Sequence, residues 1–402
     1  MARSLVFSSL LSLLALLAVP ALDARADTLR VPSQYPTIQE AIDASHDGDT
    51  VLVAPGTYVQ GLTIHHRKIL ALESESGAEA TIIDGAGARA AIDIDASDIA
   101  TRTDYRITGF TIRNGRECGI WNERGRVHIE SNIVTGNMPS GEGYNCGAIR
   151  FQDGGGSIRH NAIERNFNTG VWLINPDDVM VEGNRIEDNV NGGIRVYQTL
   201  ARQGGAKLVR NVVKGGVWLL EASGPVHMLA ADNLFVAGRL RALEVLYFSG
   251  DGLTGDFVNN TVVANTGSRP LAAFIGDISN LALANNVFYS GNDAFALTCY
   301  TFGGGSPSMH HNVAYSASGL PISGDECLDA FAKGRGNISV EPKFATGQGG
   351  SRWKLSPDSP LVDQGDNEAI GHLHRDIRGA PRIIDGGHGA VVDMGAFEYL
   401  PK

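Results

Sequence analysis

The chain is poor in charged residues (19%) and aromatic residues (7%), and it has only four cysteines among 402 residues. It has no tract of basic residues and a formal net charge of −11, which argues against nucleic acid as a partner. After an apolar run at the amino terminus, no second run is long enough to span a membrane. Glycine is abundant instead, with 50 residues, which is typical of many tight turns around an aliphatic core.

The first residues have the pattern of a secretory signal. Arg3 precedes an apolar run at residues 5–19, and Ala24, Arg25 and Ala26 form a small-residue cleavage site. We therefore expect residues 1–26 to be removed before Asp27, and the mature protein to be secreted or periplasmic. The mature chain has no further feature that predicts attachment to a membrane.

Asparagine recurs at intervals of 22 to 29 residues, each time between polar and β-branched or apolar residues. Within one interval, three short apolar runs are separated by Asn, Asp and Gly turn signals, which predicts one coil of three strands. Stacked coils bury a continuous core, so the sequence predicts an all-β chain that folds as a right-handed parallel β-helix over residues 61–345. We expect the recurring residue to adopt a left-handed φ and to stack its amide on the next coil. The nine positions are Asn132, Asn161, Asn184, Asn211, Asn233, Asn260, Asn286, Asn312 and Asn337.

The two ends of the β-helix differ from the coils. Residues 27–60 are predicted to form a cap and the first coil, with a short helix that starts near Thr37 and covers the open end. Residues 346–402 are predicted to close the last coil. Their acidic and basic side chains either fix turns and form ion pairs or make a separate site: Asp363, Asp376, Arg378, Arg382, Asp385, Asp393 and Glu398.

The four cysteines fall into two pairs that are each 28 residues apart. Cys118 and Cys146 take similar places in consecutive coils, where parallel strands lie about 4.8 Å apart. We predict a disulfide between Cys118 and Cys146, and a second between Cys299 and Cys327. The alternative of a four-thiolate metal site lacks the C-x-x-C spacing.

Two stretches of the chain resemble known proteins. The segment "TIQEAIDASHDGDTVLVAPGTY", followed by "ATIIDG" and "ITGFTIRNG", is similar to the start of exported pectin-lyase-like β-helix proteins. The tail motifs "SPLVDQG", "DIRGAPR" and "DMGAFEY" resemble the choice-of-anchor Q type of terminal segment. The resemblance implies a fold that hosts polysaccharide lyases, polygalacturonases and pectinesterases.

Alignment of the coils on one glycine predicts an aromatic row on the outer face of the first strand. The row includes Trp121, Trp172 and Trp218, and a second row includes Phe151. Rings repeated every second coil, roughly 10 Å apart, suit stacking on an extended polysaccharide. The alternative is that turn loops cover this face and the tryptophans are buried.

Polar residues in the same rows are the candidates for catalysis. The resemblance implies an Arg or Lys base for β-elimination from a uronate polymer, and calcium as the neutralising cation. We expect Arg195 as the base, Tyr197 as the proton donor, and Glu244 nearby. Alternatively, Arg195 only pairs with a neighbouring carboxylate.

Calcium, if it is used, is expected at Asp177 and Asp178 with Glu182 nearby, because hard cations prefer carboxylate oxygens. Polygalacturonase and pectinesterase motifs are absent from the central coils. The sequence leaves two hypotheses, a monomeric uronate-polymer lyase and a noncatalytic carbohydrate-binding β-helix. The negative charge argues against a polyanionic substrate unless a cation intervenes.

Overall fold

The computed structural model describes most of the chain after residue 25. The described residues are 26–65, 69–97, 103–138, 146–199, 204–237, 244–250, 252–264, 271–275, 280–291, 294–300, 307–347 and 352–401. The predicted signal, residues 1–26, lies outside this part except for its last residue.

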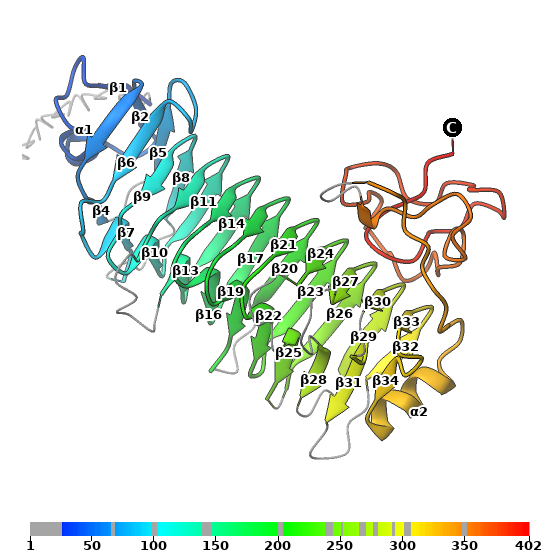
Figure 1. The fold of residues 1–402 in the computed structure, drawn as a ribbon. Helices are drawn as coiled ribbons and strands as arrows, with labels where there is room; N and C mark the ends of the chain where they lie inside the picture. Colours follow the sequence, from blue (N-terminus) through cyan, green and yellow to red (C-terminus); the bar gives the residue numbers. More distant parts are fainter. Residues whose placement is uncertain are drawn as a thin grey trace, which may run out of the picture.

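The described chain is a parallel β-helix, as predicted, in which three sheets run the length of the coils (Figure 1). Each strand pairs in parallel with the equivalent strand of the next coil, so the chain passes through the sheets in the order A, B, C in successive coils. The 12-stranded sheet A contains β1 Thr28–Val31, β2 Thr50–Val53, β5 Ile69–Ser74, β8 Asp104–Thr108, β11 Arg126–Glu130, β14 Gly155–Arg159, β17 Asp177–Glu182, β20 Gly205–Val209, β23 His227–Ala231, β26 Thr254–Val258, β29 Asn280–Ala284 and β32 Ser308–His310.

Sheets B and C have 11 strands each. Sheet B contains β3 Gly56–Val59, β6 Thr81–Asp84, β9 Thr111–Arg113, β12 Ile133–Thr135, β15 Ala162–Glu164, β18 Arg185–Glu187, β21 Val212–Lys214, β24 Leu234–Val236, β27 Thr261–Ala264, β30 Val287–Ser290 and β33 Val313–Ser316. Sheet C contains β4 Leu62–His65, β7 Ala90–Asp95, β10 Cys118–Glu123, β13 Gly147–Gln152, β16 Thr169–Ile174, β19 Gly192–Tyr197, β22 Trp218–Ser223, β25 Glu244–Ser249, β28 Leu271–Ile275, β31 Leu297–Tyr300 and β34 Ile322–Ser323.

The core is a column of aliphatic and aromatic side chains inside the three sheets. Strand residues alternate between this column and the outside, so an Ile, Val or Leu from each strand stacks on its neighbour above and below. Later coils add aromatic residues: Phe257 stacks on Phe235 and Phe288, with ring centroids 6.2 Å apart in both pairs. Parallel pairing thus repeats one burial pattern from coil to coil.

All nine recurring asparagines form one ladder between sheets A and B. Each is buried or nearly so, and in each step the backbone N–H and side-chain Nδ2 of one Asn donate to Oδ1 of the Asn in the next coil. At Asn211, for example, both donors reach Oδ1 of Asn233, at 2.8 and 3.0 Å. The same Nδ2 also donates to the carbonyl of Val181 at 2.8 Å. The predicted amide stacking is therefore present.

The left-handed residue of this turn is not the asparagine, which corrects our expectation. It is the residue before it, as at Arg210 with φ 56° and Asp232 with φ 56°. The asparagine instead satisfies backbone groups that the turn would leave buried without partners. The two roles we assigned to one position belong to adjacent positions.

Helices lie at both ends of the β-helix (Figure 1). Helix α1 (Ile38–Ala44) begins after Thr37, whose hydroxyl accepts from the Glu40 N–H at 3.1 Å, and its buried face joins the core. Helix α2 (Asp325–Lys333) lies beside β31, β32 and β34. Within the described chain, neither helix has the length and apolar character needed to cross a bilayer.

The carboxyl-terminal segment, residues 352–401 of the described chain, differs from our expectation that it closes the last coil. It lies beside the later coils (Figure 1) and packs Trp353, Phe397 and Leu361 onto the outer face of sheet B. The last coil is instead covered by α2, whose Cys327 is buried. We refer to residues 352–401 as the docked segment.

Candidate functional site

The outer face of sheet C carries one continuous row of aromatic and charged side chains. Register pairs place these residues level with one another in successive coils. We call this set the sheet C row: Asp93, Trp121, Arg150, Trp172, Arg195 and Glu221.

The predicted position of Phe151 is wrong. Ile120 pairs with Ile149, so Gly119 is level with Ala148 and not with Gly147, as our alignment assumed. Because side chains alternate along a strand, this slip of one residue exchanges the inner and outer faces of β13. Phe151 is therefore fully buried in the core, and Arg150 takes the outer position.

Trp218 does not belong to the row either. It pairs with Gly192 at the start of β22 and is partly buried, three residues before Glu221, which does belong to the row. Glu244 is level with Trp218 by backbone register, since Leu220 pairs with Leu246, and its side chain lies outside the described part. The structure thus brings together Trp121, Trp172 and Arg195 of the predicted residues, but not Trp218 or Phe151.

The two tryptophans of the row are each sandwiched between guanidinium groups. The Arg89 and Arg150 guanidinium carbons lie 3.9 and 4.2 Å from the centroid of the Trp121 ring. Those of Arg150 and Arg195 lie 5.5 and 4.8 Å from the centroid of the Trp172 ring. These distances are typical of cation–π contacts. The faces of both rings are occupied, so neither is free to stack on a sugar.

Both ends of the row are acidic. Arg89 pairs with Asp93 at 3.1 Å, and Arg195 pairs with Glu221 at 2.9 Å. Burial raises the pKa of Glu221, and the charge and hydrogen bond of Arg195 oppose that rise. The neighbouring coil thus supplies the carboxylate partner of Arg195 that we considered as an alternative to its catalytic role.

Arg150 is the residue that the sequence reasoning missed. It lies between the two tryptophans, is 7% exposed, and donates to Gln152 of the same strand. Burial lowers its pKa, and the nearest carboxylate, Glu123, opposes this shift. The signal that could have found it is the segment "CGAIRFQ", in which Ala148 and not Gly147 matches the glycine of the preceding coil.

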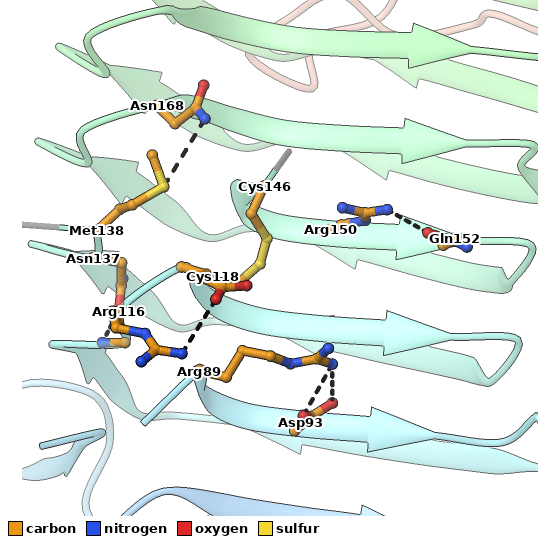
Figure 2. Close-up of a disulfide and its surroundings, with 12 residues drawn as sticks. Arg89, Asp93, Arg116, Cys118, Asn137, Met138, Cys146, Arg150, Gln152 and Asn168 are labelled. Carbon is orange, nitrogen blue, oxygen red and sulfur yellow. Dashed lines mark hydrogen bonds and ion pairs between the residues drawn. A yellow bond between two sulfur atoms is a disulfide. The ribbon is translucent and has the colours of Figure 1, made fainter. Parts of the chain in front are cut away.

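The disulfide Cys118–Cys146 lies directly beside the row (Figure 2). The two Cα atoms are 5.7 Å apart, and both sulfur-bearing side chains pack with Ala90 against Trp121. Cys299 and Cys327 are also bridged, with Cα atoms 5.3 Å apart. Both predicted disulfides are confirmed, and the first one fixes the chain before β10 and β13, which carry Trp121 and Arg150.

A second row on the same face, two residues further along each strand, is more accessible. Glu123, Gln152, Ile174, Tyr197 and Ser223 are in register, and Tyr197 is 40% exposed. Tyr197 is therefore on the same face as Arg195, as predicted. This second row forms the accessible margin of the sheet C row.

The acidic residues proposed for calcium do not form a cluster. Asp177 and Asp178 are exposed at the start of β17, whereas Glu182 ends the same strand about 16 Å away. Glu182 is ion-paired with Arg159 at 3.1 Å and with Arg210. The three residues do not fit a shared calcium site, and we derive no chemical step from calcium.

A polar cluster on the outer face of sheet A was also missed. His128 Nδ1 lies 2.8 Å from the hydroxyl of Ser157, and its Nε2 lies 3.4 Å from Asp104 Oδ1. Burial lowers the pKa of His128, and Asp104 opposes this shift. Ser157 is 5% exposed in a strand that pairs on both sides, so its neighbouring amides serve the sheet and do not form an oxyanion hole. We interpret this cluster as packing between coils.

The structure is a right-handed parallel β-helix, and the sheet C row of arginine and tryptophan side chains lies on its outer face. Comparison with known proteins agrees on the fold: a family described as the right handed beta helix region matches residues 90–227. No curated protein sequence matches the chain.

Several solved structures are similar in fold. Pectate lyase Pel9A is 14% identical with a TM-score of 0.53, and 90% of each chain is covered. XylC in complex with xylose is 12% identical with a TM-score of 0.47, and the match covers 89% of this chain and 67% of that one. A PL6 family polysaccharide lyase from Pseudopedobacter saltans is 11% identical with a TM-score of 0.44, and the match covers 81% and 98%. At this level of identity, the likeness concerns the fold alone.

Proposed function

We propose that this protein is exported and acts on an acidic polysaccharide along the outer face of sheet C, as a lyase of uronate polymers. The observation that carries the proposal is the line of three guanidinium groups, Arg89, Arg150 and Arg195, held in fixed positions by two tryptophans. Arg150 and Arg195 lie on strands two coils apart, which corresponds to about 10 Å, and Arg89 lies just before β7, two coils before Arg150. A fixed row of planar cations suits regularly spaced carboxylates.

Unpaired donors in the row support an acceptor-rich ligand. The indole nitrogens of Trp121 and Trp172 and Nε of Arg195 are buried and find no acceptor among the described residues, so a ligand oxygen would reach them after the covering side chains move. Carboxylate and hydroxyl oxygens are the acceptors that a uronate chain offers. A neutral sugar that needs a bare aromatic platform suits the row less well, because the ring faces are covered.

Export is supported by the two disulfides, since such bonds persist in oxidising compartments. The amino-terminal signal pattern agrees with this, and a pectate lyase is among the solved structures of similar fold.

In β-elimination, a base removes the proton on the carbon next to the carboxylate. The bond from the adjacent carbon to the glycosidic oxygen then breaks, a carbon–carbon double bond forms, and the leaving oxygen takes a proton. We assign Arg150 as the base in place of Arg195, because burial lowers its pKa. Arg195 then binds the sugar carboxylate, and Tyr197 on the same face donates the final proton.

The test is to incubate the mature protein with pectate, alginate and glycosaminoglycans and to follow the ultraviolet absorbance of the unsaturated product. Arg150→Lys should abolish turnover while substrate binding persists. Arg195→Ala should weaken binding by about 10-fold to 100-fold, since hydrogen bonds to charged groups contribute about 1.5–3 kcal/mol. Arg165→Ala, in the turn after β15 of sheet B, is the matched control and should change neither. Lack of the unsaturated product with every polymer would overturn the lyase assignment.

A noncatalytic carbohydrate-binding protein is the second candidate. The Arg195–Glu221 ion pair favours it, because the carboxylate holds the Arg195 guanidinium in its charged form, and the low exposure of Arg150 limits its contact with a substrate carbon. Saturable, salt-sensitive binding of a uronate polymer without any unsaturated product would identify this case. Loss of that binding in Arg195→Ala would place it on the sheet C row.

A further inference from the structure

A cluster of metal-ligand side chains lies where the docked segment meets the last coils. His310 ends β32, His311 follows it in the turn with φ 51°, and Asp366 comes from the docked segment. Among the described residues, these form the one group of three His, Cys, Asp or Glu side chains whose ligand atoms all lie within 4.8 Å of one another. The three side chains come from two parts of the fold that are far apart in sequence.

The distances between the three ligand atoms fit the face of a tetrahedron. His310 Nδ1 lies 3.3 Å from His311 Nδ1 and 3.4 Å from Asp366 Oδ2, and His311 Nδ1 lies 3.9 Å from Asp366 Oδ2. Ligands held at about 2.0–2.1 Å from a tetrahedral zinc ion lie about 3.3 Å from one another. The two rings are nearly perpendicular, at 88°, and both Nδ1 atoms point to the same carboxylate oxygen. Little movement would bring all three to one ion.

The carboxylate is held in place by its own backbone and by the β-helix. Asn285, the left-handed residue of the preceding coil, accepts from the Asp366 N–H at 2.7 Å and donates to the Asp366 carbonyl at 3.0 Å. The N–H of Glu368 donates to Oδ1 of Asp366 at 2.9 Å, which leaves Oδ2 directed at the two histidines. Such supporting contacts are what orient a ligand before a metal binds.

The position of the His311 ring is restricted by its packing against the backbone. It lies against Gly336, where an added Cβ atom would approach the ring to 2.3 Å. Gly336 has φ 73° and precedes the last asparagine of the ladder. The glycine therefore leaves the space that the imidazole fills, and the ring cannot turn toward that side.

The other charged group at the cluster is Arg335. Its NH2 lies 3.7 Å from Asp366 Oδ2, and the side chain is 80% exposed. The long distance and the exposure of Arg335 make this ion pair weak, so the guanidinium can move into solvent when a cation takes its place. We infer that His310, His311 and Asp366 bind one divalent transition metal ion of the zinc type, with one position open to solvent, and that the ion ties the docked segment to the β-helix.

The test uses the mature chain from Asp27 without a histidine tag, and the probes are zinc and cobalt alone. Calorimetry with zinc should give one saturable site, and cobalt should produce the visible absorption of nitrogen- and oxygen-ligated Co²⁺. Zinc should also raise the midpoint of thermal unfolding, because it binds the folded state. Asp366→Asn and His311→Asn should lose all three effects. Asparagine suits position 311 because Asn259 and Asn285 adopt the same left-handed conformation in earlier coils.

His372→Ala is the control, since His372 is exposed in the same docked segment and should bind as the wild type does. Circular dichroism of each variant must show the β signature, which separates loss of a ligand from loss of the fold. Zinc binding of equal stoichiometry and affinity in Asp366→Asn and His311→Asn would overturn the site. Failure of the wild-type chain to bind zinc or cobalt up to millimolar concentrations would overturn it too.

Discussion

Each asparagine of the ladder uses both ends of its side-chain amide in the protein interior. Oδ1 of Asn211 accepts from the N–H and Nδ2 of Asn184, both at 3.0 Å, while its own Nδ2 donates to Val181 and Asn233. A parallel stack with one Asn per coil is self-consistent, because each residue accepts from one neighbour and donates to the other. The same arrangement makes each member costly to remove.

Asn211→Ala should lower the free energy of unfolding by roughly 2–4 kcal/mol. The change leaves the Val181 carbonyl and the Asn184 N–H buried without these partners, and each such group costs about 1–3 kcal/mol. Denaturant unfolding of the mature chain measures the effect. Asn191→Ala is the control, because Asn191 is exposed and its Nδ2 donates to Asn168, so its loss should cost under about 0.5 kcal/mol. Equal costs for both changes would contradict the role of the ladder.

The docked segment contains a buried acid that should give the protein a pH-dependent stability. Burial, followed by repulsion from Glu398, raises the pKa of Asp393 to about 7, although the N–H groups of Asp363 and Tyr399 oppose the shift. The folded protein therefore holds this proton more tightly than the unfolded chain does. The stability from this group is complete below about pH 4 and is lost as the pH rises through about 7.

Asp393→Asn removes this titration, so it should flatten the decline in unfolding free energy between about pH 5 and about pH 8. Urea unfolding of the wild type and the variant at both pH values tests the prediction. Asp385→Asn serves as the control, since backbone donors lower the pKa of this exposed carboxylate and it is fully ionised in that range. Parallel pH profiles for wild type and Asp393→Asn would contradict the assignment.

At the scale of strands and turns, the sequence predicted the coil but not its register. The ladder asparagines mark one turn of every coil, so their spacing alone located the boundary between sheets A and B from Asn132 to Asn337. The turn before sheet C has only a shorter stack, of Asn137, Asn166 and Asn189, and the length of chain between this stack and sheet C varies from coil to coil. Alignment on Gly147 therefore slipped by one residue, and period-2 alternation converted that slip into the exchange of Phe151 for Arg150. The prediction of the fold survives an error of one residue in register, whereas the prediction of which side chains face outward at the site does not.

The disulfide between Cys299 and Cys327 should determine how well helix α2 is held in its folded position. Cys327 lies in α2 and is bridged to Cys299 of β31, so the bond ties the helix to the end of sheet C. Replacement of both residues by serine should increase amide hydrogen exchange in α2 and β34 and leave the central coils protected. Replacement of Cys118 and Cys146 is the matched control, because that loop has the same sequence separation of 28 residues. If both pairs of substitutions change α2 equally, the bridge is not what holds the helix.

At the scale of the whole molecule, the docked segment binds the left-handed residues that precede the asparagines of the ladder. The left-handed residues Asp232, Asn259, Asn285 and His311 project from successive coils, and the first three bind Arg382, the Asp393 carbonyl and Asp366. Apolar contacts of Trp353 and Phe397 with sheet B continue the same interface. The sequence could not predict this docking, because these three contacts join residues 81 to 150 positions apart. No local pattern relates them.

Arg382 is the residue on which this docking should depend most. Its side chain is fully buried, pairs with Asp232 of the β-helix, and reaches Glu398 of the docked segment at 3.3 Å.

Arg382→Met should destabilise the protein by about 3–5 kcal/mol, because it leaves buried carboxylates without their cation. The double variant Arg382→Met with Asp232→Asn should recover part of this loss, since it removes one of the orphaned charges. In a background with Trp121, Trp172 and Trp218 replaced by phenylalanine, Trp353 fluorescence reports the docked segment and circular dichroism reports the coils. The two unfolding curves should separate when Arg382→Met is added and coincide without it. Arg375→Met, at an exposed position of the same segment, should leave the curves together. Coincident curves and a cost below about 1 kcal/mol in Arg382→Met would show that the apolar contacts alone hold the segment in place.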